Sequence, residues 1–173
     1  NMTIRRCDVM TVGNGVLSTY VHNAMTDGVG KIAVLVGLES AGDKGKLEAF
    51  GKQLAMHVAA AKPQSVSRDE LDPEILERER VVLSEQARES GKPEEIIGKM
   101  VEGRLRKFYE EVCLLDQTFV IDGETQVSKA VEAAGKDAGG AISINGFKMF
   151  VLGEGIEKEV GDFAAEVAAA AGA

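Results

Sequence analysis

Near the start of the chain, apolar and polar residues follow the alternating pattern of β-strands. Two runs rich in β-branched residues, 7–12 and 16–21, flank Gly13-Asn14-Gly15, and a third run, 31–38, follows the turn residues Asp27-Gly28. Asn-Gly and Asp-Gly pairs between such runs are typical of hairpins, because these residues tolerate the positive φ angles of tight turns. The pattern therefore predicts three strands in an antiparallel meander.

Beyond these strands the hydrophobic spacing changes to that of a helix. From Lys46 to Ala61 the apolar residues recur every three or four positions, so they share one helical face. This apolar stripe consists of Leu47, Phe50, Leu54, Val58 and Ala61. Pro63 is expected to end the helix, because proline lacks the backbone N–H that a further turn needs.

Two longer helical patterns occupy the middle of the chain. The first opens at Asp72-Pro73, a capping residue followed by a proline suited to the first turn, and runs to about residue 90. The second covers residues 93–112, after a break at Ser90-Gly91-Lys92-Pro93. Because a short turn joins them and their outer faces are rich in charge, the pattern predicts an antiparallel helical hairpin that extends into solvent as a coiled-coil arm.

The last third of the chain returns to a mixed pattern. It predicts a strand over residues 118–121, a helix over 127–134, and a hairpin over 141–152 that turns at Asn145-Gly146. A final helix is predicted from about Lys158. These elements complete an order in which strands and helices are mixed and few parallel crossovers are expected.

A weak internal duplication links the middle of the chain to its end. An apolar run at residues 32–37 precedes Phe50-x-x-x-Leu54-Ala55, and a similar run at 149–153 precedes Phe163-x-x-x-Val167-Ala168. Each unit would place an alanine-rich helix on a small antiparallel sheet. The sequence therefore predicts an α+β fold with two such units and a protruding helical hairpin.

Three regions follow from this order of elements. Residues 1–62 form the first sheet and its helix, residues 63–117 form the hairpin arm with its connections, and residues 118–173 form the second set of strands and helices. A chain of 173 residues is long enough to bury an independent core.

The net charge and the number of cysteines exclude several classes of function for this chain. A formal charge of −8 argues against a nucleic-acid surface, which needs clustered lysines and arginines. Cys7 and Cys113 are too few and too far apart for a disulfide framework or a zinc site. The apolar stretches fall far short of the roughly 20 residues of a membrane helix, and no secretory signal is seen. We expect a soluble, cytoplasmic protein without direct contact to nucleic acid or membrane.

The sequence shows none of the common catalytic patterns. It has no phosphate-binding Gly-x-x-x-x-Gly-Lys loop, no Gly-x-Ser-x-Gly elbow and no His-Glu-x-x-His pair. Its two histidines, His22 and His57, lie 35 positions apart without a nearby cluster of metal ligands. The sequence therefore predicts a protein that is not an enzyme and that has no cofactor and no metal.

His57 is the residue whose role the pattern alone leaves open. It directly precedes Val58 on the predicted helix and so lies at the margin of the apolar stripe. Such a histidine is either a hydrogen-bonded residue at the boundary of the core or a contact residue for a binding partner.

Residues 51–63 form the most identifying segment of the chain. They contain Ala-Met-His-Val-Ala-Ala-Ala-Lys-Pro, which resembles the Ala-Met-His-Val-Ala-Ala-x-Lys-Pro stretch of the elongation factor Ts family. Further segments that resemble the family are residues 98–104 (Gly-Lys-Met-Val-Glu-Gly-Arg), Phe119-Val120, residues 151–158 and residues 162–167. The resemblance covers essentially the whole chain.

The resemblance implies a guanine nucleotide exchange factor that promotes GDP release from elongation factor Tu during translation. It also implies a site on two segments, the histidine segment of the helix and the Gln-x-Phe-Val segment. The residues implied to contact elongation factor Tu are Met56, His57, Phe119, Val120 and Ile121. From the residues alone, 118–121 are equally well a strand with one buried face.

One departure from the family pattern affects the expected activity. The family normally begins with a helical module and a Thr-Asp-Phe-Val motif, neither of which is found in this sequence. The resemblance therefore implies a C-terminal fragment with reduced exchange activity. An alternative is a structural module that forms homo-oligomers, in which Ile97, Met100 and Leu105 would pack between chains.

Overall fold

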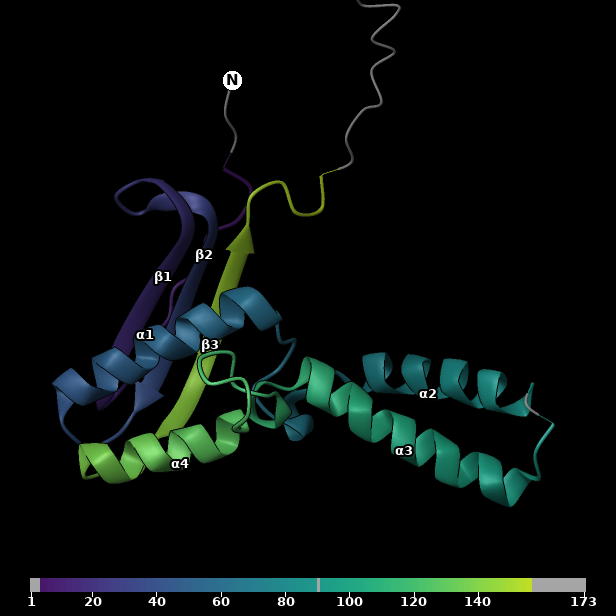
Figure 1. The fold of residues 1–173 in the computed structure, drawn as a ribbon. Helices are drawn as coiled ribbons and strands as arrows, with labels where there is room; N and C mark the ends of the chain where they lie inside the picture. Colours follow the sequence, from purple (N-terminus) through teal and green to yellow (C-terminus); the bar gives the residue numbers. More distant parts are fainter. Residues whose placement is uncertain (1–3, 90, 157–173) are drawn as a thin grey trace, which may run out of the picture.

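A computed structural model describes residues 4–89 and 91–156 of the chain, and it confirms the α+β class (Figure 1). The elements form a three-stranded sheet with one helix against it, a second helix that packs on the first, and a helical hairpin that extends away from this body. In chain order they are β1 (Gly15–Thr26), β2 (Val29–Glu39), α1 (Lys44–Ala61), α2 (Pro73–Arg88), α3 (Glu94–Val112), α4 (Val127–Ala138) and β3 (Ser143–Val151). Short 3₁₀ turns at Arg68–Glu70 and Leu114–Asp116 connect them.

The sheet is antiparallel and has the strand order β1-β2-β3. Thr19 of β1 is opposite Leu35 of β2, which in turn is opposite Lys148 of β3. The β1–β2 hairpin turns at Asp27-Gly28, where Gly28 has the positive φ of 69° that glycine adopts without strain. The turn expected there is therefore confirmed. The other edge of the central strand, β2, pairs with β3, which lies more than a hundred residues later in the chain.

The first predicted hairpin is wrong, because residues 7–12 are not a strand. Instead this segment lies against the face of the sheet that is turned away from α1. A β-carbon at Gly37 would come within 2.9 Å of Met10 Sδ, and Asp8 forms an ion pair of 2.7 Å with Lys148. The absence of a side chain at Gly37 gives the segment room to pack without pairing its backbone.

The predicted hairpin at 141–152 is also wrong. Residues 143–151 form the single strand β3, and Asn145-Gly146 lies inside it at a shift of the register with β2. An Asn-Gly pair thus accommodates an irregularity within a strand here and does not form a turn. The described residues form one sheet where two were expected, while the helix predicted from Lys158 and the repeat at Phe163 lie outside the described residues.

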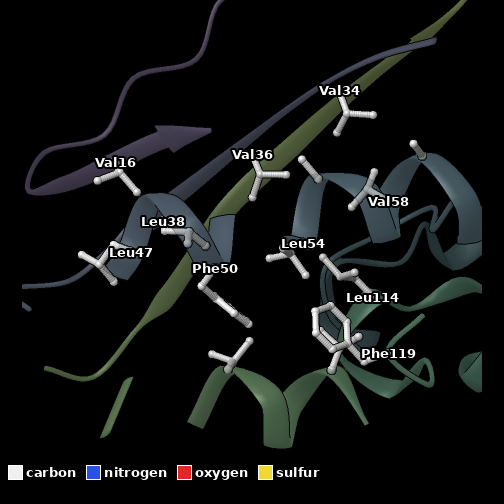
Figure 2. Close-up of a cluster of buried hydrophobic side chains, with 14 of the residues drawn as sticks. Val16, Val34, Val36, Leu38, Leu47, Phe50, Leu54, Val58, Leu114 and Phe119 are labelled. Carbon is white, nitrogen blue, oxygen red and sulfur yellow. The ribbon is translucent and has the colours of Figure 1, made fainter. Parts of the chain in front are cut away.

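The main core lies between the sheet and α1, as predicted from the apolar stripe. Figure 2 shows Leu47, Leu54 and Val58 of α1 among side chains of the sheet. The partners from the sheet are Val16, Val34, Val36 and Leu38. Asp43 caps the start of the helix, since its carboxylate accepts a hydrogen bond of 2.9 Å from Lys46 N. Lys62 caps the other end and has a left-handed φ of 49° directly before Pro63.

The predicted helical hairpin is confirmed, and it projects from the body as an arm (Figure 1). Asp72 caps α2, as expected, by accepting a hydrogen bond from Glu74 N at 2.9 Å. Between the two helices lies a small apolar core of its own, formed by Leu83, Ala87, Ile97, Val101 and Leu105. None of the helices in the described ranges is long and apolar enough to cross a membrane.

The base of the arm is fixed by a contact between side chains from three segments. The Arg68 guanidinium donates two hydrogen bonds to the Asp116 carboxylate, at 2.9 and 2.6 Å, and lies 4.8 Å from the centre of the Tyr109 ring. A bidentate ion pair with a stacked ring is directional as well as attractive. The carboxylate also raises the pKa of Arg68, so the guanidinium stays charged.

The close approach of α1 to the sheet predicts the effect of a substitution at Gly51. A β-carbon there would lie 2.2 Å from Ser18 Oγ and 2.8 Å from Ser18 Cβ. We therefore expect Gly51→Ala to lower the free energy of unfolding by about 1–3 kcal/mol, although alanine favours a helix. Urea unfolding of both proteins measures this change.

Gly98→Ala is the matched control, because a β-carbon at Gly98 meets no atom within 4 Å. It should leave the protein equally stable or raise the free energy of unfolding by up to about 1 kcal/mol. If the two alanine variants had the same stability, the close approach at Gly51 would not limit the packing of α1.

Candidate partner-binding site

A closed loop, residues 118–126, carries the exposed part of the candidate site. Thr118 is bridged to Gln126, and Phe119 N donates a hydrogen bond of 2.7 Å to Thr125 O. Within the loop, Asp122 Oδ1 accepts hydrogen bonds of 2.9 Å from both Glu124 N and Thr125 N. These bonds lower the pKa of Asp122, so its carboxylate is charged and holds the turn. The strand predicted at 118–121 is therefore wrong, because these backbone groups bond within the loop.

The loop separates its three apolar residues into one anchor and two exposed side chains. Phe119 is 4% exposed, with its ring centre 6.1 Å from that of Phe50 and 5.6 Å from that of His57. Val120 and Ile121, by contrast, are 51% and 46% exposed. A pair of adjacent apolar side chains on a hydrogen-bonded loop offers surface that a protein partner can bury at little cost in chain entropy.

His57 lies beneath this loop and is fully buried. Its Nδ1 accepts a hydrogen bond of 3.1 Å from Val120 N, and its Nε2 lies 2.9 Å from Gln117 Oε1. Because a backbone N–H can only donate, Nδ1 carries no proton and Nε2–H donates to the glutamine carbonyl. The neutral imidazole therefore joins α1 to Val120, the first residue of the exposed apolar pair.

The surroundings of His57 favour this neutral form. Removal of the ring from water lowers its pKa below the usual 6.5, while the hydrogen bond to Gln117 acts in the opposite direction and is the smaller effect. Protonation would also place a proton on Nδ1, where the N–H of Val120 already points. The hydrogen bond that holds the loop is thus compatible only with neutral His57.

Gln117 orients the histidine and was missed as a functional residue. Its side-chain nitrogen donates to Glu111 O at 2.7 Å and to Ala61 O at 3.5 Å, which fixes the amide so that its oxygen faces His57. It is only 4% exposed. A buried glutamine is uncommon, but the sequence gives no sign that this one would meet a histidine 60 positions away. The only available signal was its place in the Gln-x-Phe-Val segment.

The structure brings together four of the five residues implied by the resemblance. His57 contacts the ring of Phe119 and the backbone of Val120, and Ile121 follows on the same loop. Met56 precedes His57 on α1 and is half-buried, outside this hydrogen-bond network. His57 itself has no exposed surface in the unbound chain and lies beneath the loop.

In the described part of the chain, Cys113 is not an activated thiol and the acidic residues form no metal site. Burial raises the pKa of the Cys113 thiol, whose sulfur accepts a hydrogen bond of 3.5 Å from Ser65 Oγ, so the thiolate is disfavoured. Among residues 4–89 and 91–156, no group of three or more His, Cys, Asp or Glu side chains is placed to hold a metal ion.

The described residues thus combine an α+β body, an exposed apolar pair on a fixed loop and a helical arm. The sequence model of one family, described as elongation factor TS, matches residues 1–154, and the chain belongs to this family.

Individual relatives agree with this assignment. Elongation factor Ts of Rhodospirillum centenum is 59% identical over 172 residues, which cover 99% of this chain and 56% of that protein. Elongation factor Ts of Rhodospirillum rubrum is 60% identical over 169 residues, or 98% of this chain and 55% of the relative. That of Gluconobacter oxydans is 58% identical over 172 residues. The chain therefore spans about half the length of the curated relatives it matches.

The buried neutral histidine predicts how stability depends on pH. Because the folded pKa of His57 lies below its usual value of 6.5, the unfolded chain binds more protons between these two values. The stabilisation is complete above pH 6.5, and it is lost as the pH falls through the folded pKa. We expect the denaturant midpoint to decrease from pH 7 to about pH 5.

The His57→Gln variant should be less stable at neutral pH and should lose this slope. The His22→Gln variant, which leaves His57 in place, should keep it. A slope that survives in His57→Gln would assign the pH dependence to other groups.

Proposed function

We propose that this chain binds elongation factor Tu through the 118–126 loop and takes part in the exchange of guanine nucleotide on that protein. The observation that carries the proposal is the exposed pair Val120 and Ile121, which is held by the partly buried hydrogen bond that Val120 N donates to His57 Nδ1. Membership in the elongation factor Ts family supports it. The role is that of a cytoplasmic binding protein and not of an enzyme, because no covalent bond has to be made or broken.

Exchange of this kind depends on differential binding. A factor that binds the nucleotide-free form of a GTPase more tightly than the GDP-bound form weakens GDP binding by the same factor. Each tenfold loss of GDP affinity corresponds to about 1.4 kcal/mol of binding free energy. Rapid release therefore needs several contacts that are made best with the nucleotide-free form.

In this proposal the exposed Val120 and Ile121 supply the contact area, and the buried residues fix the conformation of the loop. Ordering a free loop during binding would cost conformational entropy, which reduces affinity. Here Phe119, His57 and the bonds around Asp122 have already fixed the loop in the unbound chain. His57 and Gln117 act as positioning residues for this surface.

The alternative, in which the arm is chiefly a module for homo-oligomers, is less well supported by the packing. Ile97 and Leu105, proposed to lie between chains in that case, are 5% and 6% exposed and pack within their own hairpin. Met100 is half-buried. A second copy would reach Ile97 and Leu105 only after the hairpin had opened. We therefore favour the exchange function.

Removal of the exposed apolar pair tests the contact directly. We expect the double variant Val120→Ala/Ile121→Ala to bind nucleotide-free elongation factor Tu roughly 10- to 100-fold more weakly, because two large side chains would lose their buried contacts. Isothermal titration calorimetry measures the change. The melting temperature should stay nearly constant, since both side chains are exposed in the unbound chain.

The matched control is Val81→Ala/Val82→Ala on α2, two adjacent valines that are 48% and 45% exposed. This variant loses a similar amount of exposed apolar surface and should bind normally. Equal affinities of the loop variant and the wild-type chain would contradict the proposed contact.

A second experiment addresses the length of the chain. Because the chain spans 56% of the elongation factor Ts of Rhodospirillum centenum, we propose that it holds part of the contact set. At equal concentration it should release labelled GDP from elongation factor Tu more slowly than that full-length relative, with weaker binding. Equal release rates would show that the segment present here is sufficient for exchange.

A further inference from the structure

The segment 98–104 of α3 is not explained by the site described so far. It lies within α3 on the arm and precedes residue 112 in the chain, whereas the 118–126 loop follows that residue. Of its seven residues, only Val101 is buried in the core of the hairpin, and Met100 is half-buried. The exposed members are Gly98, Lys99, Glu102, Gly103 and Arg104. Packing within the chain therefore accounts for little of this segment.

Gly103, like Gly98, is a residue type that is not expected here. It lies in the interior of a 19-residue helix, where glycine is less favourable than alanine because it has more backbone freedom to lose. A β-carbon at this position would meet no atom within 4 Å. The fold of the described residues thus gives no reason for glycine, whereas its bare backbone lets the surface of another molecule approach α3 closely.

The residues around Gly103 define one face of α3. Positions three, four and seven residues away lie on the same side of a helix. These are Ile96, Lys99, Met100, Arg106, Lys107 and Glu110. Most of them are opposite Ile97, Val101 and Leu105, which pack against α2, whereas Arg106 lies at the flank and also borders the hollow beside Arg80 of α2. Because α2 covers only that other side, as Figure 1 shows, we call this set with Gly103 the outer face of α3.

The outer face is basic, although the whole chain has a formal charge of −8. Lys99 forms an ion pair of 3.3 Å with Glu95. Arg106 and Lys107 take part in no ion pair within residues 4–89 and 91–156. Ile96 adds an apolar side chain that is 45% exposed. Two uncompensated cations beside an apolar residue and a bare backbone are complementary to carboxylates on a folded surface.

We propose that the outer face of α3 is a second docking surface, which receives an acidic surface of a folded protein partner at Gly103. This inference rests on the proposed function, in which the partner is elongation factor Tu. A protein fits better than RNA, because Glu95 and Glu110 interrupt the cations and the net charge of the chain repels an extended polyphosphate. The arm would then add a contact at a distance from the 118–126 loop.

The test compares glycines that differ only in their position on α3. Gly103→Ala should raise the melting temperature by a few degrees, because alanine favours a helix, and should weaken binding to nucleotide-free elongation factor Tu about tenfold. Gly98→Ala is the matched control. It also meets no atom within 4 Å, but it lines the hollow between α2 and α3. It should raise the melting temperature similarly and leave the affinity unchanged.

Charge reversal provides an independent variant. Arg106→Glu/Lys107→Glu should reduce the affinity at least tenfold at low salt and less at high salt, since the lost attraction is screened. Arg78→Glu/Arg88→Glu, with the same change of charge on α2, is the control and should have a much smaller effect. An RNA-binding assay with tRNA and light scattering on the free chain accompany the calorimetry.

The outcomes separate this inference from the proposed function. No binding by the wild-type chain would overturn both. Normal binding that is weakened by Val120→Ala/Ile121→Ala, but by neither Gly103→Ala nor the charge reversal, would overturn only the docking surface on α3. So would a charge reversal that changed only tRNA binding or only the oligomeric state. Loss of affinity in both outer-face variants, with unchanged controls, would support it.

Discussion

The hydrogen bonds between His57, Gln117 and Val120 join the three parts of the structure that the candidate site needs. His57 belongs to the helix on the sheet, Gln117 also bonds to Glu111 at the base of the arm, and Val120 belongs to the exposed apolar pair of the loop. The hydrogen bonds themselves are buried or partly buried, so an unpaired donor or acceptor there would be costly. The network therefore makes the position of the loop depend on the packing of both the helix and the arm.

The elements most accurately predicted from the sequence are those in which local pattern and tertiary packing agree. The apolar stripe from Leu47 to Val58 predicts α1 because the same residues that favour the helix also face the sheet. The hairpin arm is similar, with capping by Asp72 and a seam that includes Val101. In both cases the information is contained within a few turns of helix.

The predictions that were wrong concern segments whose structure depends on distant parts of the chain. Asn145-Gly146 has the local signature of a turn, but pairing with β2, a hundred residues earlier, keeps it inside a strand. The segment 7–12 has the composition of a strand, but it packs by side chains on Gly37. Within the candidate site, the apolar pair followed from family resemblance, whereas the role of Gln117 depends on a histidine that no local pattern connects to it.

The attachment of the arm has a mechanical consequence. A helix of 19 residues is about 28 Å long, so a tilt of about 10° at its base displaces the tip by about 5 Å. The pairing of Arg68 with Asp116 and its stacking on Tyr109 resist such a tilt at the pivot. The arm therefore pivots within a few residues of Gln117. A force on its far end would be transmitted to the hydrogen bond between Gln117 and His57.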